Sequence, residues 1–193
     1  KNFMKKLSLI LSSILVLLFT LFNSTFSETK DIIYSEAKVI SYNATEIIVT
    51  DGDSLRFGKE KIRLFGIDAP EIKQMCKNEF SENYSCGEEA KKYLNMYIQS
   101  AAEIKKKIYC YYSERDRYNR ILGECFWGNP EETRGFGSSA ININYFMVLM
   151  GHAVAYLRYS DKYSEAEKGA KAIKSGLWQG KFDLPEDWRR KNK

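Results

Sequence analysis

Residues 63–71 read RLFGIDAPE and carry the strongest signal in the chain. The apolar and β-branched residues predict a strand over residues 62–67, and Pro70 stops it because the backbone before a proline is restricted. Two carboxylates, Asp68 and Glu71, follow the strand directly. This stretch therefore predicts both a strand end and a place where charged side chains gather.

A tight bend precedes it, because residues 51–54 read DGDS between two predicted strands. Asp53 and Asp68 thus come from different strand ends. Hard divalent cations prefer oxygen ligands, so the pair is a candidate Ca²⁺ or Mg²⁺ site, with the backbone carbonyl of Ala69 as a further ligand. Aspartate is also common in turns, and Asp53 alone would be read as a turn residue.

Two arginines supply positive charge, one within the RLFGIDAPE stretch and one later in the chain. Arg63 opens the RLFGIDAPE stretch, and Arg120 ends a DRYNR segment at residues 116–120. Each can donate paired hydrogen bonds to a phosphate and offset charge in a transition state. The alternative is that they are surface arginines or bridge to carboxylates.

Glu71 follows Pro70, whose fixed φ stiffens the local backbone. A carboxylate held near a metal can take a proton from water, although a lone glutamate is usually a solvated surface residue.

The only histidine, His152, lies just beyond a predicted helix, which favours capping or packing over catalysis. Metal ligands, a base and two guanidinium groups together predict phosphodiester cleavage.

Tyr118 and Tyr156 are candidate nucleotide-binding residues, because aromatic rings stack on bases in single-strand binding. The chain contains 13 tyrosines, so a core role is an equal alternative for either.

The rest of the pattern predicts an α+β fold. Short strands, then an inserted helix, then more helices suit a five-stranded Greek-key β-barrel with packed helices. Strands are predicted at residues 37–41, 46–50, 54–57, 62–67, 107–113, 120–127 and, as a short extended segment, 154–159, and helices at 87–102, 140–150 and 161–175.

The bulk properties allow one domain with a proper core, at 193 residues. The net charge of +5 includes three lysines of the N-terminal leader. Without these lysines the net charge is only mildly positive, so attraction for phosphate must come from local basic patches.

The N-terminus predicts an export signal. Lys5 and Lys6 precede an apolar run at residues 7–22, and small residues at Thr25 and Ser27 favour cleavage after Ser27. The alternative is an uncleaved membrane anchor, although the run is a little short for a span of about 20 residues. Domain organisation follows as a signal peptide at residues 1–27, a linker at 28–36, the main domain at 37–188 and a basic tail at 189–193.

Four cysteines suit an oxidising compartment. Cys110 and Cys125 are equidistant from the turn centre of a predicted hairpin and would face each other across it, which leaves Cys76 and Cys86 to close a short loop. Four free thiols remain an alternative, whereas the spacing lacks the close pairs of a zinc site. We expect two disulfides if the protein is exported.

Together, DGDS, RLFGIDAPE and DRYNR resemble the thermonuclease, or staphylococcal-nuclease-like, family in order and rough spacing. GEEA at residues 87–90, residues 151–156 and GLW at 176–178 resemble further blocks, so that the resemblance runs from about residue 37 to 188. It implies an OB-fold barrel with three helices and cleavage of DNA or RNA to 3′-phosphate and 5′-hydroxyl ends. With the predicted export signal, we expect an exported (periplasmic or secreted), sugar-nonspecific endonuclease.

By position, the resemblance implies Asp53, Asp68 and the Ala69 carbonyl as Ca²⁺ ligands and Glu71 as the general base. It implies Arg63 and Arg120 as phosphate and transition-state clamps. Tyr118 and Tyr156 fall where the family places nucleotide-contacting tyrosines, and we expect a monomer with no obligate protein partner.

Two departures from the family pattern stand out. Asn119 occupies a position where glycine is usual, and asparagine tolerates left-handed backbone better than most residues. The segment between Cys76 and Cys86 follows Glu71 closely, and a disulfide there would stiffen the loop of the base or narrow substrate access.

Two other functions remain open at this stage. One is a catalytically inactive OB-fold module that binds nucleic acid, and the other is a membrane-anchored interaction protein. Glu71 argues against a pure binder, because binding phosphate requires no carboxylate beside it.

Overall fold

The computed structural model describes residues 37–131 and 140–192. The predicted signal peptide and linker lie outside these residues. Within them, no helix is both long and apolar enough to cross a bilayer. The division of the chain into leader, linker and domain stays a prediction.

Six strands form one continuous path in a mixed sheet. The order is β1-β8-β9-β4-β3-β2, and a short strand, β10 (Ile141–Asn142), adds to β9. Only β4 and β9 are parallel, and the other neighbours are antiparallel. The six strands are β1 (Lys38–Asn43), β2 (Ile47–Asp51), β3 (Ser54–Phe57), β4 (Glu60–Leu64), β8 (Lys107–Tyr112) and β9 (Ile121–Trp127).

The sheet curls, but its strand pairings do not close into a barrel. The strands at the two ends of the path, β1 and β2, are consecutive in the chain and are joined by the 3₁₀ helix η1 (Ala44–Glu46). The predicted α+β class is confirmed, and the strand pairings leave the predicted five-stranded β-barrel open. The chain changes direction at η1, and in the described residues no strand pairing joins β1 to β2.

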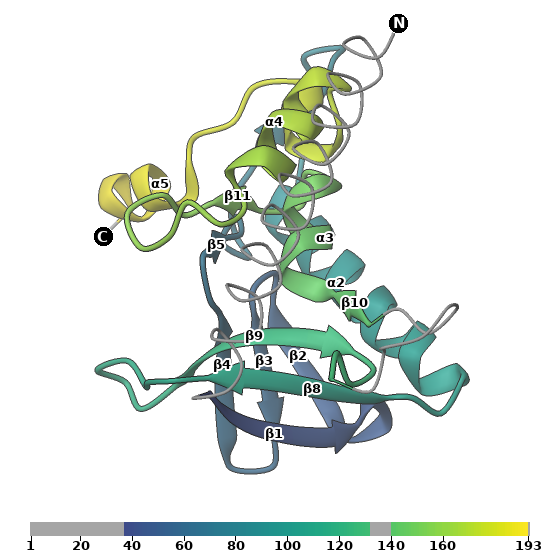
Figure 1. The fold of residues 1–193 in the computed structure, drawn as a ribbon. Coiled ribbons are helices and arrows are strands. Elements are labelled where there is room, and N and C mark those ends of the chain that lie inside the picture. The colour runs from purple at the N-terminus through teal and green to yellow at the C-terminus, as the bar shows by residue number, and fades with distance from the viewer. Residues whose placement is uncertain (1–36, 132–139, 193) are drawn as a thin grey trace, which may run out of the picture. The chain divides into compact units, whose positions relative to one another are not determined.

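In the described residues, four α-helices accompany the sheet (Figure 1): α2 (Cys86–Glu103), α3 (Ile143–Leu149), α4 (Ser164–Ala172) and α5 (Pro185–Lys191). The first three confirm the predicted helices, although α3 starts later than residue 140 because β10 precedes it. Helix α5 was not predicted from the sequence, and its last turn falls in the predicted basic tail at residues 189–193. Proline at its first position and acidic residues in its first turn are typical helix starts.

The main core lies between the sheet and the apolar face of α2. Ala90, Leu94 and Ile98 recur at helical spacing and are buried, and α2 packs against β2. Leu55 and Ile62 from β3 and β4 are also buried in this core. Burial of such side chains is worth about 1.5–3 kcal/mol each, so this packing fixes the strand ends that carry the site.

The predicted strand at residues 62–67 is interrupted. Gly66 has a φ of +76°, which turns the chain, and β5 (Ile67–Asp68) then pairs with β11 (Val154–Ala155) instead of continuing in the main sheet. The extended segment predicted from residue 154 is therefore only two residues of strand. A third small sheet pairs β6 (Cys76–Lys77) with β7 (Asn83–Tyr84).

Candidate active site

Asp53 lies at the bend between β2 and β3 and is 1% exposed. It accepts hydrogen bonds from the Ser54 hydroxyl at 3.0 Å and from the backbone N–H of Ala69 at 2.9 Å. Gly52 makes this approach feasible, because a Cβ there would lie 2.7 Å from the Cβ atoms of Ala69 and Ala90. The DGD bend and the RLFGIDAPE stretch are thus in direct contact.

Arg63 joins the two aspartates. From β4, its Nη1 donates to Asp53 and its Nη2 donates to Asp68 Oδ1 at 2.6 Å. Asp68 is also 1% exposed. A guanidinium cation therefore lies between two buried carboxylates. Asp53 and Asp68, which were predicted from the sequence as a pair, do lie close together.

Burial dominates the electrostatics of Asp53. Removal from water raises the pKa of this carboxyl to about 7, while the neighbouring Arg63 is the strongest influence that lowers it. The ion pair with Arg63 favours the ionised form of Asp53, whereas burial disfavours it. A carboxylate held at such a cost is typical of a functional site.

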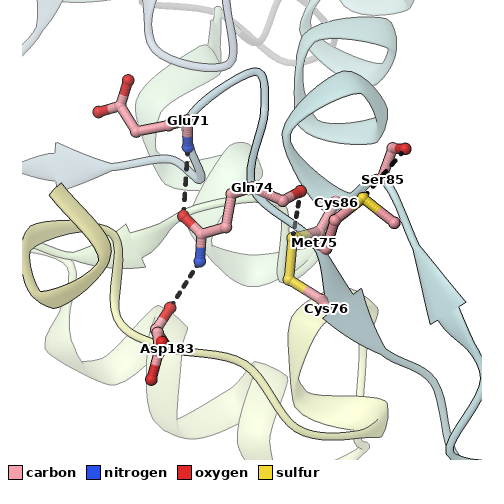
Figure 2. The surroundings of a disulfide bond; sticks show 7 residues. All are labelled: Glu71, Gln74, Met75, Cys76, Ser85, Cys86 and Asp183. Atoms are coloured by element: carbon pink, nitrogen blue, oxygen red, sulfur yellow. Dashed lines mark hydrogen bonds between the residues drawn. A yellow bond between two sulfur atoms is a disulfide. The ribbon is translucent and has the colours of Figure 1, made fainter. Parts of the chain in front are cut away.

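Glu71 follows β5 beside the start of α2. Its backbone N–H donates to Gln74 Oε1 at 3.3 Å, while its carboxylate points away from Gln74 (Figure 2) and its side chain is 34% exposed. Gly87 lets α2 begin against this backbone, because a Cβ there would lie 1.8 Å from the Glu71 carbonyl oxygen. The backbone is therefore held while the carboxylate remains open to water.

Arg189 of α5 also contacts Asp68 and Glu71, although nothing in the sequence pattern predicts this. Its Nη1 donates to Glu71 Oε1 at 2.8 Å and to Asp68 Oδ1 at 2.9 Å, and its Nη2 donates to Asp68 Oδ2 at 2.9 Å. We refer to Asp53, Arg63, Asp68, Glu71 and Arg189 as the carboxylate cluster. Burial opposes the charged form of Arg189, but the hydrogen bonds that it donates to both carboxylates outweigh burial and raise its pKa, so it stays charged.

The donor set suits a hard divalent cation. The two buried carboxylates contact two cationic groups, because Arg63 bonds both of them and Arg189 bonds Asp68. No group of three or more His, Cys, Asp or Glu side chains gathers as a metal site in the described residues. Asp53 and Asp68 would therefore hold the ion as a pair, and the remaining ligands would be backbone carbonyl, water or substrate oxygens.

Arg120 lies in a separate region, the turn at residues 116–120. Its Nε and Nη2 both donate to Asp116 Oδ2 at 2.7 Å, a contact within the same turn, and the structure brings it to none of the three cluster carboxylates. The exposed ring of Tyr118 lies under Arg117 and Arg120, 4.8 and 5.5 Å from their guanidinium carbons. Asn119 has a φ of +61°, so the turn keeps left-handed backbone at this position.

Tyr156 and His152 have different surroundings. Tyr156 is half-buried, its ring contacts Tyr159, and nearby Asp68 and burial both raise its pKa. It therefore lies beside the carboxylate cluster. His152 stacks on Tyr93 at 3.6 Å between ring centroids, and burial lowers its pKa to about 4, which fits the packing role.

Both expected disulfides are present, Cys76–Cys86 and Cys110–Cys125, and no free cysteine occurs in the described residues. Cys110 and Cys125 are direct partners across β8 and β9, as the symmetric hairpin predicts. Cys76–Cys86 ties β6 to the start of α2, next to Gln74 (Figure 2).

Comparison with known proteins agrees with this geometry. The family model described as "Staphylococcal nuclease homologue" matches residues 61–180, more than half of the chain, and the chain therefore belongs to this family. The matched stretch includes Arg63, Asp68, Glu71 and Arg120, whereas Asp53 and Arg189 lie outside it.

Individual relatives are more distant. The chain is 29% identical over 134 residues to the succinoglycan biosynthesis protein ExoI of Rhizobium meliloti (strain 1021), covering 68% of this chain and 62% of that protein. It is 27% identical over 151 residues to endonuclease YhcR of Bacillus subtilis (strain 168), covering 72% and 11%. It is 28% identical over 143 residues to an uncharacterized endonuclease of Escherichia coli, covering 71% and 77%. The chain thus spans less than two thirds of the first two relatives.

Proposed function

We propose that this chain is an exported, calcium-dependent nuclease that hydrolyses phosphodiester bonds of DNA and RNA. The observation that carries this proposal is the buried pair Asp53 and Asp68, joined by Arg63, with the partly exposed Glu71 beside it. Membership of the nuclease family and two relatives named as endonucleases support it.

Each residue has a defined role in the proposed reaction. Asp53, Asp68 and the Ala69 carbonyl would hold the Ca²⁺ ion, which when bound would neutralise phosphate charge. Glu71 accepts a proton from a water molecule, whose oxygen then attacks phosphorus. Arg63 and Arg120 donate hydrogen bonds to phosphate oxygens in the transition state.

The product ends follow from the bond that breaks. The bond between phosphorus and the 5′-oxygen is cleaved, and the 5′-oxygen takes up a proton as it leaves. The products carry a 3′-phosphate and a 5′-hydroxyl. Contacts to phosphate and stacking by Tyr118 and Tyr156 would not discriminate among bases, which fits action on both DNA and RNA.

Product-end analysis tests the proposed reaction. Purified protein with Ca²⁺ is incubated with end-labelled DNA and RNA, and the fragments are treated with polynucleotide kinase with and without prior phosphatase. We expect fragments that the kinase labels directly, because they carry 5′-hydroxyl ends. Intact nucleic acid that is nevertheless bound would instead indicate the inactive binding module.

Export is proposed on two observations. The leader has the composition of a signal peptide, and the described cysteines form two disulfides, which persist in oxidising compartments. Expression of the full chain in bacteria, followed by fractionation and N-terminal sequencing, tests it. A mature N-terminus at Glu28 in the periplasm or medium is the expected result, and retention of the leader in the membrane would indicate an anchor.

A further inference from the structure

The C-terminal helix contributes a charged side chain to the site from the far end of the chain. Arg189 contacts carboxylates that lie 118 and 121 residues earlier, with three hydrogen bonds of 2.8 to 2.9 Å. It bonds both oxygens of Asp68, which is buried, and is itself 31% exposed. Such a paired arrangement is geometrically specific and stronger than a single surface ion pair.

The segment that carries Arg189 is held at several points. Lys77 and Lys181 exchange backbone hydrogen bonds of 2.8 and 3.0 Å across a bridge between β6 and the segment. Pro185, the first residue of α5, is buried. Arg158, which follows β11, pairs with Glu186 of α5 at 2.7 Å. The position of Arg189 therefore follows from tertiary packing.

Gln74 connects this segment to the backbone of Glu71. Its side chain is fully buried, its Nε2 donates to the carbonyl of Asp183 at 2.7 Å, and its Oε1 accepts from the Glu71 N–H (Figure 2). The neighbouring Cys76–Cys86 disulfide holds the loop in which Gln74 lies. Backbone and side chain of Glu71 are thus both linked to the same C-terminal segment.

Arg63 reaches only two of the three carboxylates in the carboxylate cluster. Asp53 and Asp68 share Arg63, which does not contact Glu71. Within the described part of the chain, Arg189 is the side chain that bonds the Glu71 carboxylate, and it does so only through Oε1. The second oxygen, Oε2, is left to accept a proton from water.

We propose that Arg189 is a positioning residue, which holds the carboxylate of Glu71 beside Asp68 so that Oε2 meets the attacking water. The role rests on the proposed function, because it takes Glu71 as the base. It makes the docked C-terminal segment part of the active site. A misplaced general base lowers the reaction rate but leaves substrate binding intact. A displacement of about 1 Å can lower the rate about 10²-fold.

The test compares Arg189→Gln with Arg190→Gln. Arg190 is the neighbouring arginine on the same helix, is 75% exposed and pairs only with Asp187 in the described residues. For Arg189→Gln we expect a fall in kcat of about 10- to 100-fold with little change in KM or melting temperature, and for Arg190→Gln no change. Arg189→Lys keeps the charge but loses the paired geometry, so its kcat should lie between that of Arg189→Gln and wild type.

A second mutation shows whether Arg189 acts through Glu71. In a Glu71→Gln background, adding Arg189→Gln should lower kcat little further, because the base that it positions is already lost. A structural role would give additive losses instead. Additive losses, or a wild-type kcat in Arg189→Gln, would overturn the proposal.

Calcium binding provides a readout that does not need catalysis. Calorimetric titration should show Ca²⁺ binding several-fold more tightly to Arg189→Gln than to wild type, because a cation bonded to both Asp68 oxygens is gone. Arg190→Gln should bind like wild type. Tighter Ca²⁺ binding together with a lower rate at saturating Ca²⁺ supports positioning, whereas an unchanged or higher rate at saturating Ca²⁺ would show that Arg189 only opposes metal binding and would overturn the proposal. Absence of hydrolysis in wild type would instead contradict the proposed function.

Discussion

The carboxylate cluster and the turn at residues 116–120 each supply one of the two predicted arginines, but they hold them differently. Arg63 is 16% exposed and bonds two buried aspartates, Asp53 at the bend before β3 and Asp68 beyond the turn at Gly66. Arg120 is 31% exposed and bonds Asp116, four residues earlier in the same turn. Tertiary packing fixes Arg63, whereas local contacts fix Arg120.

The difference indicates how each arginine would meet a substrate. Arg63 is already beside the aspartates that would hold the metal, so its position is prepared before binding. Arg120 must give up or share Asp116 to reach a phosphate. Preorganised donors contribute most to a transition state, because no reorganisation is needed at the moment of reaction. We therefore expect the two regions to respond unequally to mutation.

Glu71→Gln should have the largest effect on rate. A general base contributes about 10²–10⁴-fold, and glutamine keeps the shape but cannot accept the proton. We expect kcat to fall by that factor while a nucleotide 3′,5′-bisphosphate still binds. Initial rates on DNA and inhibitor titration measure both quantities, and Asp116→Asn in the turn serves as the matched control with a much smaller effect.

A near wild-type rate in Glu71→Gln would make Glu71 a bystander. Another base would then be needed, and His152 would be tested first, although its packing against Tyr93 argues against it.

Arg63→Lys should have the next largest effect. Lysine keeps the charge but loses the planar fork that bonds two aspartates. Losing one preorganised donor costs about 10²–10³ in rate. Steady-state kinetics and circular dichroism check this, and a normal kcat with a normal spectrum would remove Arg63 from the mechanism.

Arg120→Lys should lower the rate less, by about tenfold to 10²-fold. Arg120 is bonded to Asp116 within its own turn and is therefore not preorganised to bind the phosphate. The same kinetic assay applies. A loss equal to that of Arg63→Lys would show that the turn closes on the cluster when substrate binds, and would remove the contrast between the two regions.

Stability should depend on pH with opposite signs in the two regions. Burial raises the pKa of Asp53 to about 7, so the folded state is less stable once pH rises through that value. Asp53→Asn should therefore stabilise the metal-free protein above pH 7, by roughly 1–4 kcal/mol at about 1.4 kcal/mol per tenfold change in proton affinity, and the gain should vanish under acidic conditions.

Asp116 should behave in the reverse way. Partial burial opposes its ionisation, but hydrogen bonds from the backbone and side chain of Arg120 outweigh it and lower the pKa. Asp116→Asn should destabilise the protein at neutral pH, and the loss should fade as pH falls through the pKa of the folded state. Urea unfolding from pH 8 down to about pH 2 measures both variants, because the pKa of Asp116 lies below its ordinary value, and equal pH profiles would contradict the assigned environments.

The sequence predicted the part of the site that depends on short-range pattern. DGD precedes β3 and RLFGIDAPE begins in β4, and Ser54 lies opposite Arg63 in this antiparallel pair, so Asp53, Arg63 and Asp68 converge once β3 and β4 pair. The disulfide between Cys110 and Cys125 followed from hairpin symmetry for the same reason. Each prediction needed only a strand period and a turn.

Arg189 could not be placed this way. Its partners lie more than a hundred residues earlier, and docking depends on a buried glutamine and a two-residue bridge, neither of which has a sequence period. The helix itself was readable, because Pro185 is followed by acidic residues and then by basic residues of the last turn. A run of charges at a chain end was instead interpreted as a solvated tail.

The metal dependence of hydrolysis tests the central claim most directly. Initial rates of acid-soluble nucleotide release from DNA are measured for the wild-type protein with Ca²⁺, with Mg²⁺ and with EDTA. Hydrolysis that requires Ca²⁺ and stops in EDTA is the predicted result, because Asp53 and Asp68 would then hold the ion that the reaction needs. Undiminished hydrolysis in EDTA would contradict the assignment of these aspartates as a metal site.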